Sequence, residues 1–225
     1  MAAARLVIGR ALGWLLLLLA GGGIALWSKS AFAIAALAAA GAWVLFLFFS
    51  LYFFRDPDPR VPTDLGAVVA PAHGLVDCVE QVDEPQFLGG RCRRVSILLS
   101  VLDVHVQNAP VAGRIAFLKY QPGRFLSALK TASARGNENL LIGIESSERP
   151  GARIAVRQIA GVLARRVVSW VNLDEIVARG QRLGLIQYGS RCDLYLPLAF
   201  AVTVRPGNRV TGGETVVALL PERIS

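Results

Sequence analysis

An uncharged stretch of 24 residues, 31–54, constrains the fold of this 225-residue chain more than any other feature of its sequence. A helix rises about 1.5 Å per residue, so a helix of that length can cross the roughly 30 Å hydrocarbon core of a bilayer. A shorter apolar run covers residues 11–27, and Ser28, Lys29 and Ser30 separate the two runs. We therefore expect residues 1–54 to form a membrane anchor of two apolar helices, a transmembrane hairpin.

The alternative to an anchor is a cleaved signal peptide, because basic residues precede the apolar run and the sequence AFA at 31–33 imitates a cleavage site. We favour the anchor, since the longer run follows immediately and would still hold the chain in the membrane. Basic residues stand before, between and after the two runs, namely Arg5, Arg10, Lys29, Arg55 and Arg60. The positive-inside rule then predicts that both ends of the hairpin lie in the cytoplasm.

From residue 55 onward the pattern changes to that of a mostly β domain. The run RDPDPR at 55–60 ends the apolar segment, because two prolines stop a helix. Short apolar runs between Gly, Pro and Asn then predict strands at 68–70, 95–101, 104–106, 113–118, 140–145, 153–159, 183–187 and 192–196. Short helices are expected at 125–133, 161–166 and 173–178. The predicted fold class is α+β, mostly β.

Two late segments share one pattern, a polar approach punctuated by glycine and followed by an apolar strand. They are EIVARGQRLGLI at 175–186 and VRPGNRVTGGETVVALL at 204–220. The pattern resembles a lipoyl-like barrel-sandwich. We therefore expect residues 55–225 to form one antiparallel, barrel-sandwich-like domain.

The net charge of +8 comes almost wholly from arginine and indicates an anionic partner. Because the chain has no helix-turn-helix pattern, zinc-ligand spacing or aromatic RNA-reading motif, we expect no nucleic acid and assign the charge to anionic lipid head groups. Three cysteines, Cys78, Cys92 and Cys192, form neither a paired framework nor a C-x-x-C motif, which is typical of a reducing compartment. We expect no metal site and interpret Cys192 as a buried structural thiol.

A Gly-Ser pair at Gly189 and Ser190 lies between two predicted strands, in QYGSRCDLYLP at 187–197. Most such pairs are simple turns. A Ser190 hydroxyl held against the unobstructed carbonyl of Gly189 nevertheless has the geometry for attack on its own backbone. The resulting ester would break by β-elimination, leaving a free carboxyl group on Gly189 and a dehydroalanine that hydrolyses to a pyruvoyl group. Such a group is an electron sink made from the protein itself.

Five segments resemble, in order, the phosphatidylserine decarboxylases, in particular the short bacterial and archaeal form. They are FFRDPDPR at 53–60, SILLSVLDVHVQNAPVAG at 96–113, YQPGRF at 120–125, QIAGVLARRVV at 158–168 and GLIQYGSRCDLYLP at 184–197. Together they span nearly all of the chain after residue 50. Five ordered matches are far more specific than any one of them.

The resemblance implies a pyruvoyl-dependent carboxy-lyase that is made as a zymogen. Autocatalytic cleavage between Gly189 and Ser190 would give a larger chain, 1–189, and a smaller chain, 190–225, paired as a heterodimer, with a homodimer as a further option. The pyruvoyl group derived from Ser190 would form a Schiff base with phosphatidylserine and yield phosphatidylethanolamine and carbon dioxide, a step of phospholipid biosynthesis. The enzyme would work at an anionic membrane, with its catalytic domain on the cytoplasmic face of the bacterial inner membrane.

The two histidines of the chain both fall in matching segments. His105, in LDVHVQNAP, takes the place of the family's catalytic histidine and is expected to transfer protons near neutral pH. His73 stands in APAHG, where the family usually has Ala-Asp-Gly, and by resemblance that aspartate helps to activate the serine. His73 can still act as a base toward Ser190, directly or through His105, but brings no permanent negative charge. Asp77 and Asp103 lie near the histidines in sequence and are candidates to supply a carboxylate.

Other departures concern the surroundings of the site. Gln107-Asn108 replaces the family's Asn-Arg, and the run NEN at 137–139 matches its Asn-Glu-Arg only in part. Guanidinium groups suit phosphate oxygens. The candidates for the lipid phosphate, none of them favoured over a solvated surface, are Arg91, Arg93, Arg94, Arg165 and Arg166.

Three functions fit these observations. The first is a self-processing phosphatidylserine decarboxylase, and this is the function that we expect. The second is a decarboxylase of a different serine-headed lipid, to which the Gln107-Asn108 pair points. The third is a relative that has lost self-processing and binds anionic lipid without turning it over, which His73 favours.

Overall fold

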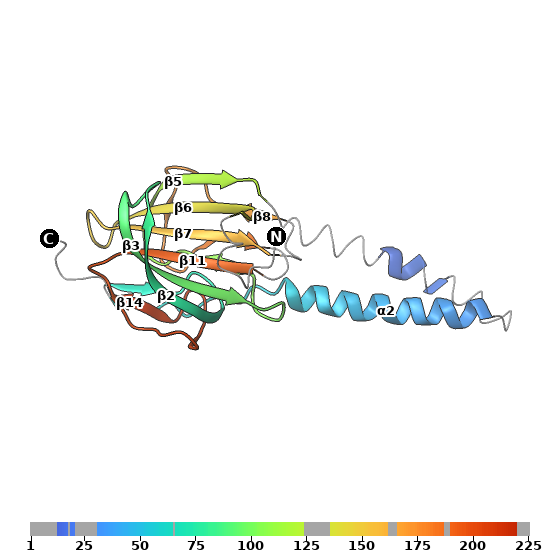
Figure 1. Ribbon diagram of the computed structural model, residues 1–225. Coiled ribbons are helices and arrows are strands. Elements are labelled where there is room, and N and C mark those ends of the chain that lie inside the picture. Colours follow the sequence, from blue (N-terminus) through green and yellow to red (C-terminus); the bar gives the residue numbers. More distant parts are fainter. Residues whose placement is uncertain are drawn as a thin grey trace. The chain divides into compact units, whose positions relative to one another are not determined.

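The computed structural model describes residues 13–17, 19–20, 31–64, 66–123, 136–161, 166–186 and 190–219. The chain divides into two units, Met1–Arg55 and Asp56–Ser225. The regular structure described in the first unit is helical, and that described in the second consists of strands joined by turns and loops (Figure 1).

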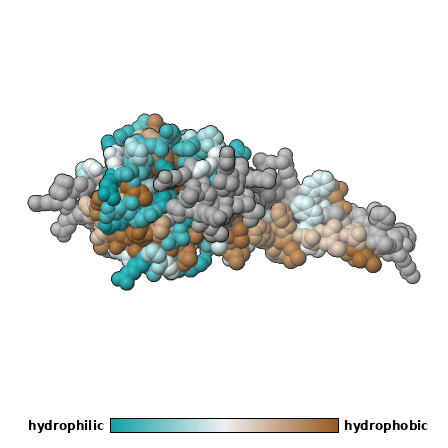
Figure 2. Space-filling view, viewed as in Figure 1, coloured by the Kyte–Doolittle hydropathy of each residue, from teal (hydrophilic) through white to brown (hydrophobic). Residues whose placement is uncertain are grey.

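The first unit contains one long helix, α2, over Ala31–Phe53. Its large apolar side chains are exposed, as Ile34 at 74%, Leu45 at 72% and Phe48 at 66% show, and the helix surface is correspondingly apolar (Figure 2). The part Ile34–Phe53 is long and apolar enough to cross a membrane. Residues 13–17 and 19–20, in the first apolar run, are also helical.

The described residues of the second unit form fourteen strands. Their bounds are β1 (Ala67–Val69), β2 (Gly74–Glu84), β3 (Gly90–Leu99), β4 (Val106–Asn108), β5 (Gly113–Gln121), β6 (Asn139–Ser146), β7 (Arg153–Ala160), β8 (Val167–Ser169), β9 (Ile176–Val177), β10 (Arg182–Ile186), β11 (Ser190–Pro197), β12 (Ala201–Val202), β13 (Arg209–Val210) and β14 (Val216–Leu219).

These strands make one large curled sheet and two small ones (Figure 1). The large sheet has eight strands in the order β13-β2-β3-β11-β7-β6-β5-β9, and the small sheets are β1-β14-β12 and β4-β10-β8. Neighbouring strands run antiparallel throughout the three sheets. The predicted class, mostly β and antiparallel behind an N-terminal apolar helix, is therefore confirmed.

Strand β11 lies inside the large sheet, between β3 and β7. Successive side chains of a strand point to opposite faces. Accordingly Cys192, Leu194 and Leu196 are buried in the main apolar core, whereas Tyr195 packs in a second apolar cluster. Both faces of β11 are thus covered, the core face by apolar side chains and the other face by Tyr195 together with the buried charged residues Arg191 and Asp193.

Most predicted strands are found within a few residues of their expected bounds, but the structure differs from the prediction at three notable places. Strand β2 was not predicted, because its acidic and polar residues mask its apolar alternation. The strand expected at 104–106 lies at 106–108 instead. The helix expected at 173–178 is wrong, since Asp174 has a φ of 65° and its N–H donates to the Ile115 carbonyl beside β5. The helices expected at 125–133 and, except for its end residues, 161–166 lie outside the described residues.

The proline-rich linker, residues 56–64, is fastened to the second unit. Arg182 at the start of β10 pairs with the carboxylates of Asp56 and Asp58, both at 2.7 Å. Arg179 donates to two linker carbonyls at 2.8 and 3.0 Å. The linker is therefore part of the β unit, although the sequence does not reveal which residues hold it there.

Candidate active site

Ser190 is the first residue of β11 and lies opposite Leu99 on β3 and Ala160 on β7. On the other side of the predicted cleavage bond, Ile186 ends β10 and pairs with Val167 on β8. Residues 187–189, which include Gly189, lie outside the described part of the chain. The backbone is thus held by strand pairing both just before and just after this short segment, as the sequence predicted for a bend between two strands.

His105 lies in the loop between β3 and β4 and is completely buried. Its Nδ1 is 2.8 Å from the carbonyl oxygen of Asp103. Because a carbonyl oxygen only accepts hydrogen bonds, Nδ1 carries a proton, so that in the neutral form of the ring the lone pair lies on Nε2. The carbonyl of His105 also accepts the backbone N–H of Ile186 at 3.2 Å. His105 is therefore attached to the strand that leads into the predicted cleavage bond.

Gln107 and Asn108, which depart from the family pattern, hold this loop in place. The Gln107 side chain donates to the His105 carbonyl at 2.7 Å and accepts from Gln158 at 3.1 Å. The Asn108 side chain donates to the Gly180 carbonyl at 2.8 Å. Both side chains are buried, so their role is to position the backbone around His105.

His73 is half-buried and directly precedes Gly74, where β2 begins. A Cβ on Gly74 would overlap the Leu98 carbonyl oxygen, so this close approach of β2 to β3 requires glycine. A Cβ on Gly212 would lie 3.0 Å from both His73 Cδ2 and Asn108 Oδ1. His73 therefore packs against Gly212, near the end of β4 that Asn108 occupies.

The three predicted site residues are far apart in the sequence, but they lie at the same end of the large sheet. Ser190 starts β11 opposite Leu99. His73 precedes Gly74, the first residue of β2, and Gly74 lies close to Leu98 of β3, which is next to Leu99. His105 is bonded to the last residue of β10. The starts of β2 and β11 are two strand spacings apart, roughly 10 Å across the sheet.

Both candidate carboxylates have arginine partners. Asp103 accepts the Ser100 N–H at 2.8 Å and forms an ion pair with Arg209. Asp77 forms an ion pair with Arg191 at 2.5 Å. Arg209 could not be singled out from the sequence, because only the pairing of β13 with β2 brings it to this end of the sheet.

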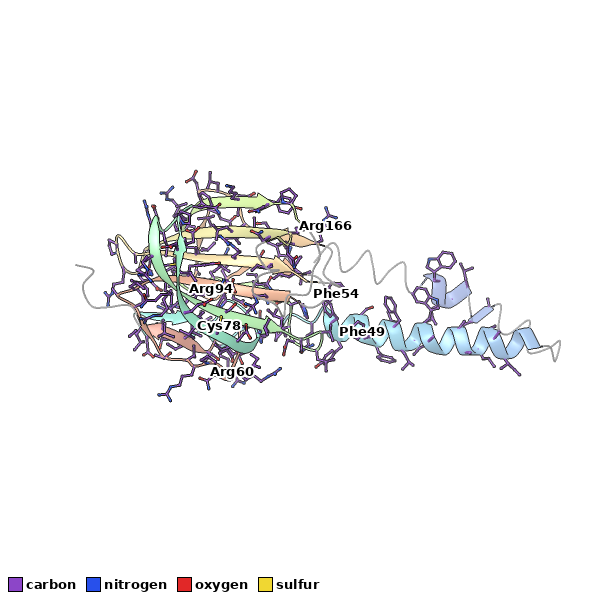
Figure 3. The ribbon with its side chains drawn as sticks, in the orientation of Figure 1. Phe49, Phe54, Arg60, Cys78, Arg94 and Arg166 are labelled. Carbon is purple, nitrogen blue, oxygen red and sulfur yellow. The ribbon has the colours of Figure 1, made fainter. Side chains whose placement is uncertain are left out.

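The candidate phosphate ligands separate into two groups. Leu99 on β3 lies opposite Ser190, the first residue of β11. Three of the arginines lie on β3 five or more residues before Leu99, namely Arg91, Arg93 and Arg94. At about 3.4 Å per residue, they are roughly 17 Å or more from the position opposite Ser190. Arg166 is exposed and precedes β8, whose first residue pairs with the last residue of β10. Figure 3 shows Arg166 at one end of the sheet and Arg94 away from that end. Arg165 lies outside the described residues.

The site thus combines a serine at the start of an inner strand with a buried histidine, a second histidine and a nearby arginine. No group of three or more His, Cys, Asp or Glu side chains among the described residues is arranged to hold a metal ion. Serine as a nucleophile and histidine as a base are residue types suited to acyl transfer. The fold and site define the class: a mainly antiparallel β-sheet enzyme with a serine and histidine site, preceded by an apolar helix.

Sequence comparisons identify the family within this class. A family model described as phosphatidylserine decarboxylase matches residues 46–218. A protein of Symbiobacterium thermophilum, named phosphatidylserine decarboxylase proenzyme, is 45% identical over 174 residues, which are 77% of this chain and 80% of the relative. Relatives of the same name are 43% identical in Desulfotalea psychrophila, over 75% of this chain and 78% of the relative, and 40% identical in Chlorobium phaeovibrioides, over 83% of each. The chain belongs to the phosphatidylserine decarboxylase family and is a carboxy-lyase.

Proposed function

We propose that this chain is a self-processing phosphatidylserine decarboxylase, which releases the serine carboxylate of phosphatidylserine as carbon dioxide and leaves phosphatidylethanolamine. The observation that carries the proposal is the way in which the backbone is held on both sides of residues 187–189. Ser190 pairs with β3 and β7, and Ile186 is bonded to His105. A scissile bond placed between two such anchors cannot easily turn away from the residues that act on it.

Maturation would use the protein's own atoms. The Ser190 hydroxyl attacks the Gly189 carbonyl carbon, the peptide bond to nitrogen breaks, and an ester forms. β-Elimination then frees the Gly189 carboxyl group and leaves dehydroalanine, which takes up one water, loses ammonia and becomes the pyruvoyl group. We assign proton transfer in this sequence to His105, whose Nε2 carries the lone pair, and to His73 in place of the family's aspartate.

A pyruvoyl group supplies a ketone that takes up the electrons released with carbon dioxide. The residues present fit such a group, because its amide carbonyl remains the residue 190 carbonyl of β11 and needs no further ligand. His105 is assigned the proton that replaces the departing carboxylate. Its complete burial keeps bulk water from competing for that proton.

The proposal also covers how the protein is attached to the membrane and how its two fragments stay together. We assign residues 1–54 to a membrane anchor and 55–225 to the catalytic domain, on the cytoplasmic face of the bacterial inner membrane. The exposed apolar side chains of α2 support the anchor, and an anionic membrane would supply the lipid. After cleavage, chains 1–189 and 190–225 would remain a heterodimer, because β11 is an inner strand.

The alternative functions receive different support. Gln107 and Asn108 are committed to internal hydrogen bonds, so they do not favour a different serine-headed lipid. The loss of the family's aspartate at His73 still favours a relative that binds anionic lipid without processing. The state of the chain after synthesis separates this alternative from the proposal.

The intact mass of the purified full-length protein under denaturing conditions tests the proposal. We expect two fragments that divide at Gly189, the smaller one lighter than a peptide starting with Ser190 by one ammonia. Ser190→Ala should give a single full-length mass and is the control. A single full-length mass of the unaltered protein, persisting on long incubation, would reject self-processing and leave lipid binding without catalysis.

Substitutions at His73 test the base assigned there. His73→Ala should slow cleavage by roughly a hundredfold, which is typical of a lost general base. His73→Asp should cleave at least as fast as the unaltered protein, because a carboxylate can orient and stabilise an imidazolium. Cleavage of His73→Ala at the unaltered rate would remove His73 from the mechanism and leave the proton transfers to His105.

A further inference from the structure

Arg191 follows the predicted cleavage bond by one residue and is completely buried. It pairs with Leu98 on β3 and with Ile159 on β7. A guanidinium group in such a place has lost its hydration, and it is tolerated only when charged and polar partners surround it. The partners of Arg191 therefore indicate what this charge is for.

The Arg191 guanidinium is held by residues on two other strands. Its Nη1 donates to the hydroxyl of Ser96 on β3 at 3.0 Å. Its Nη2 donates to the carboxylate of Asp77 on β2 at 2.5 Å. The ion pair thus crosses the whole width of β3 and joins β11 to a strand with which β11 does not pair.

A β-bulge makes this contact possible. The pairing of β2 with β3 passes from Val76 opposite Ile97 to Cys78 opposite Ser96, so Asp77 is the extra residue. A bulge leaves its residue out of the ladder and redirects the side chain. Asp77 is consequently free of the regular alternation of β2 and reaches across to Arg191.

The apolar face of β11 cannot fix the position of this strand by itself. Its core residues, Cys192, Leu194 and Leu196, are all apolar and recur at every second position. A slip of two residues would keep an apolar side chain in nearly every core position. The same slip would remove Arg191 from Asp77 and bury its charge without a partner.

Cleavage makes such a slip a real hazard. In the intact chain, residue 190 is joined covalently to the segment that leads back to β10. In the cleaved protein it becomes the first residue of a new chain, and chain ends fray unless they are tied down. The reactive group would then lie on the terminal residue, and Arg191 is the residue that joins it to the rest of the strand.

We infer that Arg191 is a positioning residue, which clamps the start of the new chain through Asp77 and Ser96 and so keeps residue 190 in register opposite Leu99 and Ala160. The inference rests on the proposed self-processing at Ser190. It assigns a role to a residue next to the cleavage bond and to a bulge that the sequence does not reveal.

Arg94 provides a matched control. It is also buried and forms ion pairs with Glu80 on β2 and Asp193 on β11. It lies opposite Tyr195, five residues along β11 from Ser190. Loss of Arg94 therefore removes a similar buried charge from the same three strands. It reaches the start of β11 only indirectly, through Asp193 and the Ser96 hydroxyl that donates to it.

The test compares Arg191→Met, Arg191→Lys and Asp77→Asn with Arg94→Met in the full-length protein. Cleavage is followed by intact mass, turnover by kcat and KM, and local order by amide hydrogen exchange at residues 191–193. Arg191→Met and Asp77→Asn should lose kcat by roughly tenfold to a hundredfold, as expected for a reacting group displaced by about 1 Å, with KM little changed. Arg191→Lys should recover part of the loss, and only the variants at 191 and 77 should lose exchange protection.

The outcomes separate the clamp from the function on which it rests. Normal cleavage and kcat in Arg191→Met would reject the clamp and leave the decarboxylase intact. An equal loss of kcat in Arg94→Met would also reject it, because the effect would then be one of general stability. If the unaltered protein were never cleaved, the proposed function would fail, and unchanged exchange at residues 191–193 in Arg191→Met would show that the clamp fails as well.

Discussion

Cys192 lies two residues beyond Ser190, and its thiol is fully buried on the core side of β11. Burial, and after it the nearby Asp193 carboxylate, raises the pKa of Cys192 well above its usual value. The thiolate is the reactive form of cysteine, so a raised pKa and a lack of access both make this thiol inert. The interpretation of Cys192 as a structural thiol agrees with its burial in the core.

This burial predicts the order in which the cysteines react with iodoacetamide. In the native protein at pH 8, partly exposed Cys78 should be alkylated first. Cys92, whose pKa is raised to about 11 mainly by desolvation, and Cys192 should remain unmodified until denaturant is added. Peptide mass mapping measures each site, and the denatured protein is the control. Stoichiometric alkylation of native Cys192, with retained fold, would contradict its burial.

At the residue scale, the sequence could supply the chemical groups but not their partners. Ser190, His105 and His73 stand in segments that resemble a known family, so they could be named as candidates. The contact between Asp77 and Arg191 joins positions 114 residues apart. It also depends on a bulge, which leaves no mark in a run of alternating residues, so no local pattern could have predicted it.

At the scale of elements, the linker shows how much the sequence leaves open. Its prolines and charges predict the end of the apolar helix correctly. Its attachment to the β unit depends on Arg182, which is 126 residues from Asp56. The strands could be placed because burial on one or both faces imposes apolar residues, whereas the pairing of a charged linker with a distant strand imposes no such pattern.

Loosening this attachment should have a modest, salt-dependent effect. Arg182→Met removes two ion pairs that are partly screened by water, so we expect a loss of about 0.5–1 kcal/mol in the free energy of unfolding. For a unit of this size that corresponds to a fall in Tm of about 1–4 °C. Thermal unfolding in detergent at low and high salt measures the effect, which should shrink as salt screens the charges.

Arg153→Met serves as the comparison for Arg182→Met. Arg153 has a more exposed side chain and forms one ion pair, to Glu145 at 3.3 Å. Its loss should change Tm by no more than about 1 °C. Equal Tm shifts in the two variants, or a shift in Arg182→Met that is the same at both salt concentrations, would show that the linker is not held by these charges.

At the scale of the whole molecule, the C-terminal part of the chain is woven into the β unit at several places. Residues 190–219 contribute β11 to the interior of the large sheet, β13 to its edge, and β12 and β14 to a small sheet with β1. The strands that receive them, β1, β2, β3 and β7, all precede Gly189. The large sheet and the sheet β1-β14-β12 are therefore each built from both fragments, and only the small sheet β4-β10-β8 lies within residues 1–189.

We accordingly predict that cleavage will not separate the fragments. Chains 1–189 and 190–225 should elute together in detergent and should dissociate only at a denaturant concentration that also unfolds the sheet, because an inner strand has hydrogen-bonded neighbours on both sides and apolar contacts on both faces. Size-exclusion chromatography with mass analysis of each fraction measures this, and a sample in strong denaturant gives the positions of the separate fragments. Release of the smaller chain under native conditions would contradict the placement of β11 inside the sheet. Retention through the denaturant series up to the unfolding transition would show that the strands of residues 190–219, with β11 between β3 and β7, hold the enzyme together once its chain is cut.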